Sequence, residues 1–72
     1  MNYIKENTYV VACNEPLRLL TKAAEDGLQI TILNPGSKVF CKSYTVDDKN
    51  DTWIRTNDGW VRATYNNHVL IR

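Results

Sequence analysis

The sequence predicts a small all-β domain, because it combines strand-like periodicity with well-placed turn residues. Residues 28–32 alternate apolar and polar side chains strictly, which is the pattern of a half-buried strand. Asn34-Pro35-Gly36 follows and is typical of a tight turn, since Pro fixes φ and Gly accepts positive φ. A hydrophobic content of 43% in 72 residues is enough for one folded domain, whose core is thin because the chain is short.

Further strand candidates lie on both sides of this segment. Residues 8–13 are rich in β-forming side chains and end at the turn formers Asn14-Glu15-Pro16. Residues 38–46 form one long strand candidate, which runs into the wholly polar loop 47–51.

The clearest hairpin comes next. Residues 52–56 and 60–63 flank Asn57-Asp58-Gly59, a connection that suits a type I turn with Gly59 in the αL region. Residues 68–71 then make a short C-terminal strand after an Asn66-Asn67 turn.

One segment is ambiguous between helix and strand. Local propensity over residues 16–27 favours a helix of about ten residues, because Pro16 suits the first helical position and Gly27 the position just past the end. Leu17, Leu20 and Ala24 would then share one face. The alternative is a strand followed by a loop.

The charge balance disfavours two classes of partner. Nine Lys and Arg against eight Asp and Glu give a net charge of +1, whereas proteins that bind nucleic acid usually carry a clear basic excess. No apolar run approaches the roughly 18 residues of a membrane span. We therefore expect neither nucleic acid nor membrane as a partner. The start resembles no secretory signal, which indicates a cytoplasmic protein. If the chain is excised from a larger secreted protein, the extracellular space or the cell wall is expected instead.

Chemistry-bearing residues are few and scattered. Cys13 and Cys41 are expected as free, partly buried thiols, with their pairing left open. His68 is the only histidine, and Lys49 interrupts the acidic loop 47–51, which lacks the spacing of a calcium loop. We expect no catalytic residue, no metal site and no cofactor, and a solvated loop at residues 47–51.

The aromatic residues are more informative. Trp53 and Trp60 each lie two residues from an arginine, so each shares a strand face with that arginine. If Ile54, Val61 and Ala63 face the core, both Trp side chains face outward or lie under a loop. An exposed Trp beside an Arg is typical of binding surfaces, whereas the alternative is that the Trp rings cover a thin core. The candidate partner-binding residues are Trp53, Trp60, Arg55, Arg62, Tyr44 and Tyr65.

A family resemblance rests on the spacing of several short motifs. The motifs that carry it are Leu17-Arg18-Leu19, Ile30, Leu33-Asn34-Pro35-Gly36-Ser37-Lys38-Val39, Trp53, Gly59-Trp60-Val61 and Tyr65. Together they resemble the bacterial SH3-like domain over roughly residues 9–71. The resemblance implies an SH3-like barrel of about five to seven short strands. It also implies a strand at residues 17–20, with at most one short helical turn near residues 21–26.

Two functions follow as expectations. The first is a non-catalytic module that binds another protein or a peptide, such as a phage or mobile element makes to modulate a host protein. The alternative, which the resemblance implies, is a cell-wall module that binds peptidoglycan. Against it, Thr21-Lys22-Ala23 replaces the family's Ser-Gly-Pro in the loop on which a cell-wall ligand site depends. Weak self-association stays open, since a small barrel can bury an aromatic patch against a second copy.

Overall fold

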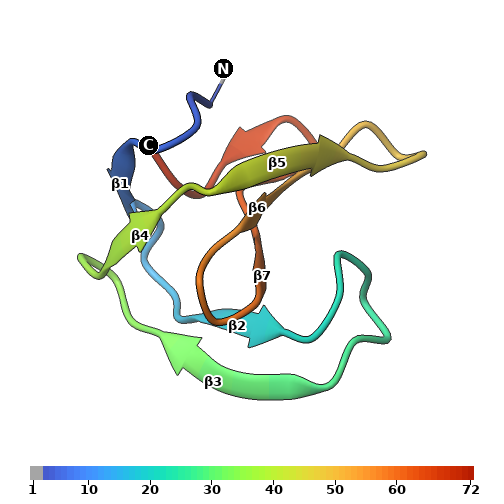
Figure 1. Cartoon of the computed structure of the whole chain (residues 1–72), viewed down its shortest axis with the longest axis horizontal. Helices are drawn as coiled ribbons and strands as arrows, with labels where there is room; N and C mark the ends of the chain where they lie inside the picture. The colour runs from blue at the N-terminus through green and yellow to red at the C-terminus, as the bar shows by residue number, and fades with distance from the viewer. Residues whose placement is uncertain (1–2) are drawn as a thin grey trace.

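A five-stranded antiparallel sheet forms the centre of the fold, with strand order β3-β2-β7-β6-β5 (Figure 1). Its strands are β2 (Leu17–Leu20), β3 (Gln29–Leu33), β5 (Ser43–Val46), β6 (Thr52–Arg55) and β7 (Trp60–Arg62). Two smaller antiparallel pairs complete it: β1 (Thr8–Val10) with β4 (Lys38–Phe40), and β8 (Thr64–Tyr65) with β9 (His68–Val69). The structure is a computed structural model that describes residues 3–72. The first two residues of the chain, which belong to the segment compared with a secretory signal, lie outside the described residues.

The predicted all-β class is confirmed. The sheets wrap around one core into a barrel-like fold of nearly equal dimensions, 24 × 24 × 23 Å. The described residues form nine short strands, more than the expected five to seven, because residues 38–46 are divided into β4 and β5 and residues 60–65 into β7 and β8. Residues 3–72 contain no helix, and therefore none long and apolar enough to cross a membrane.

The ambiguous segment is a strand followed by a bend. Leu17–Leu20 pairs with β3 on one side and with β7 on the other, so a helix there would leave β3 without its strand partner and β7 paired with β6 alone. The helical turn expected near residues 21–26 is not formed. The chain instead bends, and the Gly27 N–H closes a turn on the Ala24 carbonyl at 3.0 Å.

The prediction of one continuous strand over residues 38–46 is wrong. The chain breaks at Cys41-Lys42, so that β4 pairs with β1 while β5 pairs with β6. Cys41 is fully buried at this corner, and its N–H donates to the Asn7 carbonyl at 2.9 Å. The bend carries the chain from one sheet to the other, which closes the core.

The hairpin between β6 and β7 forms as predicted, with one difference. Gly59 has a φ of 159°, which lies outside the αL region. A Cβ at this position would lie 2.6 Å from the Leu20 carbonyl oxygen, so Gly59 is needed for the close approach of β2. The Asn34-Pro35-Gly36 turn is confirmed with Gly36 at φ 87°, and Asn66 and Asn67 both have positive φ in the turn between β8 and β9.

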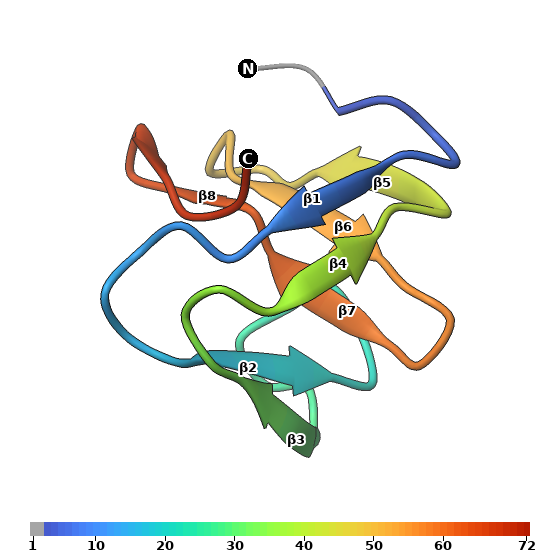
Figure 2. The same ribbon diagram turned by 90° about the vertical axis from the view of Figure 1, so that its left-hand side faces the viewer.

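The core lies between one face of the five-stranded sheet and the β1–β4 pair, which Figure 2 shows in front of β6 and β7. Ile54, Val61 and Ala63 face it with no exposed surface, so the condition set for these three residues from the sequence holds. The buried core residues are Tyr3, Val11, Leu19, Val39, Cys41, Ile54, Val61, Ala63 and Ile71. Both cysteines are free thiols, with Cys13 half-buried.

Candidate functional site

The face of the central sheet opposite the core carries a second, smaller cluster built on β6 and β7. Trp53 and Arg62 are paired across these strands, so both side chains lie on this face. The Arg62 guanidinium carbon lies 4.5 Å from the centre of the Trp53 ring and 4.7 Å from that of Tyr65. This geometry is a double cation–π contact, which holds Arg62 in one orientation.

Trp53 lies under the loop that joins β5 to β6, with 2% of its surface exposed. Its indole Nε1 donates to Oδ2 of Asp47 at 3.0 Å, while Oδ1 of Asp47 accepts the N–H groups of Lys49 and Asp51 at 2.9 Å each. Burial alone would raise the pKa of Asp47, but these hydrogen bonds, from Trp53 first, hold that pKa below its ordinary value.

The expectation of a solvated loop at residues 47–51 is therefore wrong at two positions. Asp47 is tied to Trp53 and to its own loop, and Asp51 is buried with 4% of its surface exposed. Oδ1 of Asp51 accepts the Asn66 N–H at 2.9 Å, which fastens the β5–β6 loop to the β8–β9 turn. Both carboxylates are structural because they satisfy backbone N–H groups that the tight loops leave without partners.

Arg62 is joined to a loop far away in sequence. Its two terminal nitrogens each lie 3.3 Å from the same oxygen, Oε1 of Glu25, in the bend after β2. The Arg62 side chain keeps 17% of its surface exposed and the Glu25 side chain 62%. Nε of Arg62 is buried and has no hydrogen-bond partner among the described residues.

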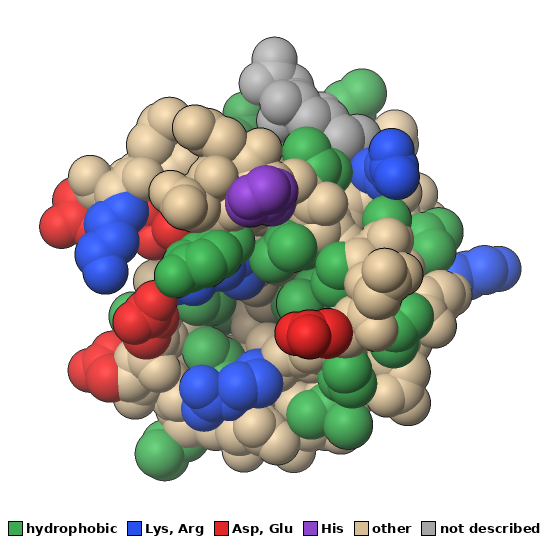
Figure 3. Space-filling view, turned by 180° about the vertical axis from the view of Figure 1, so that it is seen from behind, with side chains coloured by type: hydrophobic (Ala, Val, Ile, Leu, Met, Phe, Trp, Pro, Cys, Tyr) green, Lys and Arg blue, Asp and Glu red, His purple; other side chains and the backbone are tan. Residues whose placement is uncertain are grey.

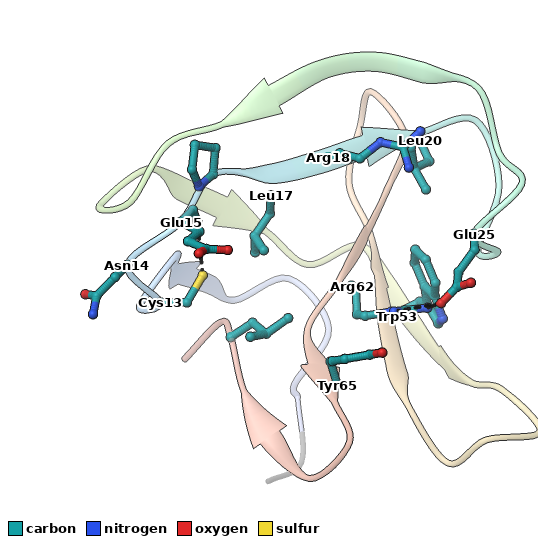
Figure 4. A pocket seen from close by; sticks show the side chains of 12 residues that line it. Cys13, Asn14, Glu15, Leu17, Arg18, Leu20, Glu25, Trp53, Arg62 and Tyr65 are labelled. Atoms are coloured by element: carbon teal, nitrogen blue, oxygen red, sulfur yellow. Dashed lines mark hydrogen bonds and ion pairs between the residues drawn. The ribbon is translucent and has the colours of Figure 1, made fainter.

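A groove of about 530 Å³ opens beside this cluster. Figure 3 shows a hollow on this side of the molecule, with hydrophobic side chains around it and charged side chains of both signs at its edge. Apolar walls come from Pro16 and Leu17 at the start of β2, from Leu20, and from Leu70 near the C-terminus. Figure 4 shows Arg62 extending between Trp53 and Tyr65 toward Glu25 at one end, with Cys13, Asn14 and Glu15 at the other.

The structure divides the six predicted binding residues into three groups. Trp53, Arg62 and Tyr65 line the groove together. Arg55 and Trp60 pair with each other nearer the hairpin turn, on the same sheet face but outside the groove. Tyr44 pairs with Ile54, a core residue, so it lies on the other face of the sheet, where it is 42% exposed.

Several groove residues were not among the predicted ones. Glu25 lies in the segment 16–27 that is ambiguous between helix and strand, and no local pattern connects it with Arg62, which is 37 residues away. Leu17 and Leu20 were weighed only as one face of a helix or as strand residues. A strand over residues 17–20 places Arg18 and Leu20 on one face. That alternation could have predicted that these two residues line the same surface.

The described residues bring no cluster of three His, Cys, Asp or Glu side chains together in a way that could hold a metal ion. No protein-family model, curated protein or solved structure matches the chain. Its function is therefore inferred from the groove itself.

Proposed function

We propose that this domain is a non-catalytic interaction module that binds an extended segment of a partner protein in the groove. The observation that carries the proposal is the position of Tyr65. Its ring is 48% exposed at the groove, yet its contact with Arg62 holds it in place. Aromatic residues that are both exposed and preorganised are typical of binding hot spots, because little conformational entropy is lost on binding.

The composition of the groove supports a peptide-like ligand. Its lining combines the apolar side chains of Pro16, Leu17 and Leu70 with the arginines Arg18 and Arg62. An extended peptide offers both apolar and polar groups to such a surface, as in aromatic grooves that bind extended segments. Kinship with bacterial SH3-like domains, whose barrels bind ligands in loop-lined grooves, is part of this proposal.

The test compares two exposed tyrosines on opposite faces. Binders are selected from a random peptide library, and their affinities are measured for the native protein and for Tyr65→Ala and Tyr44→Ala. We expect Tyr65→Ala to weaken binding about tenfold or more, with a stability loss of about 1 kcal/mol or less from the lost cation–π contact. Tyr44→Ala should bind like the native protein.

Two results would contradict the proposal. One is the absence of any binder from the library. The other is equal affinity of all three proteins for the selected peptides, which would place their site outside the groove. Co-sedimentation with purified peptidoglycan that Tyr65→Ala abolishes would instead favour the cell-wall alternative.

A further inference from the structure

We propose that the segment bound in the groove carries a carboxylate that pairs with Arg62, in the place that Glu25 holds in the free protein. This inference rests on the proposed function and specifies the partner's chemistry. It starts from Arg62, which is held in place by two rings while its own hydrogen-bonding capacity is largely unused.

The aromatic pair does not form a cage for a ligand cation, because Arg62 already occupies it. The guanidinium carbon lies within 4.7 Å of both ring centres, so no second cation fits on those faces. The two rings instead hold the Arg62 guanidinium in one orientation at the groove. This group is planar, permanently charged and a hydrogen-bond donor only. Such a group is suited to bind an anion, and its fork matches a carboxylate, the group that Glu25 presents to it in the free protein.

The contact with Glu25 is an incomplete version of that pairing. A single carboxylate oxygen is shared by two nitrogens at 3.3 Å, longer than the usual 2.7–2.9 Å of charge-assisted bonds. Exposed pairs of this kind contribute little to stability, and Glu25 lies on a bend with most of its side chain in solvent. A ligand carboxylate can therefore displace Glu25 and form two parallel bonds.

The remaining groove charges fit the same occupant. With Glu25 paired to Arg62, the arginines Arg18 and Arg62 balance the glutamates Glu15 and Glu25. Once Glu25 moves out, two arginines face one glutamate and the groove becomes cationic. Leu17 and Leu70 line the same groove, so the expected motif is an acidic residue with an apolar residue nearby.

The experiment uses the peptides selected from the random library. We expect Asp or Glu to be enriched beside apolar residues, and replacement of that acid by its amide to lower affinity about 10- to 100-fold. Glu25→Gln should raise the affinity for acidic peptides about 2- to 5-fold, because it removes the internal competitor. Asp26→Asn, in the same bend but paired with Lys22, is the matched control and should leave affinity unchanged.

A second arm distinguishes the source of the carboxylate. Each peptide is also made with an amidated C-terminus, which lowers affinity only if the terminal carboxylate is the ligand. The NMR signal of the Arg62 Nε–H reports on the electronic state of the same guanidinium group, and it should shift with the acidic peptide more than with its amide analogue. These measurements change only the peptide or Glu25, so the test does not require an Arg62 variant, which could fail to fold.

The outcomes separate this inference from the proposed function. Peptides that need Tyr65 but show no preference for a carboxylate would overturn the carboxylate inference and leave the interaction module in place. Weaker binding of acidic peptides to Glu25→Gln would also overturn it, since Glu25 would then support the ligand instead of competing with it. A library without binders would contradict both.

Discussion

At the scale of single residues, Asp47 shows how one carboxylate organises a loop. Three donors converge on its two oxygens, namely the Trp53 indole and the N–H groups of Lys49 and Asp51. Its position after β5 and before a run of polar residues is typical of a turn that an Asp side chain closes. The contact with Trp53 is the additional feature, because it joins the loop to the sheet and covers the ring.

The pH dependence of stability should report this residue. The hydrogen bonds hold the native pKa of Asp47 below its ordinary value of 3.8, so their contribution is complete above that value. It is lost as the pH falls through the lower native pKa. We expect Asp47→Asn to lower the free energy of unfolding by about 1–2 kcal/mol near neutral pH. This difference from the native protein should shrink below about pH 4.

The measurement is urea unfolding followed by tryptophan fluorescence over a series of pH values. Asp48→Asn is the matched control, because Asp48 is an exposed neighbour in the same loop. A constant difference between the native protein and Asp47→Asn from neutral to acidic pH would contradict the assignment.

At the scale of elements, the β6–β7 hairpin holds both sides of the molecule together. One face of it carries Ile54 and Val61 into the core, and the other carries Trp53 and Arg62 to the groove. Strand periodicity predicted this division because alternation is a local property. It did not predict which outward residues are covered, since alternation does not say how a loop folds over the sheet. Trp53 thus lies under a loop, and Trp60 is half-buried.

The close approach of the hairpin to β2 is tested at Gly59. A Cβ there would lie 2.6 Å from the Leu20 carbonyl oxygen and 2.8 Å from Cδ1 of Ile30. The first of these is backbone of a paired strand and cannot move aside cheaply, so we expect Gly59→Ala to lower the free energy of unfolding by about 1–3 kcal/mol.

Thermal unfolding of the variants checks this expectation. Gly36→Asn is the control, because open space surrounds Gly36 and Asn tolerates its positive φ. It should melt close to the native protein. Equal melting temperatures for Gly59→Ala and the native protein would show that β2 does not approach the hairpin so closely.

At the scale of the whole molecule, the fold closes by joining its two ends. Val11 and Ile71 form an isolated antiparallel bridge, and Val10 and Arg72 exchange backbone hydrogen bonds at 3.0 Å in both directions. The buried Tyr3 hydroxyl donates to the Ile71 carbonyl in the same region. Burial raises the pKa of Tyr3 to about 12, helped by the nearby Tyr9 and Cys41.

Alkaline unfolding should depend on this contact. Because the native pKa of Tyr3 lies above its ordinary value of 10, its contribution is complete below about pH 10. It is lost as the pH rises toward 12. We expect Tyr3→Phe to cost about 1 kcal/mol near neutral pH through the lost hydrogen bond, and this difference to shrink above about pH 10.

Urea unfolding at neutral and alkaline pH measures both effects. Tyr44→Phe is the matched control, because Tyr44 is exposed on β5. Loss of its hydroxyl should change neither the stability near neutral pH nor its dependence on alkaline pH. A pH-independent difference for Tyr3→Phe would mean that the phenol is not buried in the native state.

The sequence by itself determined the features that depend on residues close together in the chain. Alternation identified most of the strands and the division of the hairpin into two faces, and Gly, Pro and Asn marked the turns. Tertiary structure alone decided three others: a strand at residues 17–20 where propensity favoured a helix, the burial of Trp53, and the pairing of Arg62 with Glu25. The strand and the Arg62–Glu25 pair depend on contacts between segments distant in sequence, whose free energy exceeds the small local preferences of the chain. The burial of Trp53 depends on how the neighbouring loop folds over its ring.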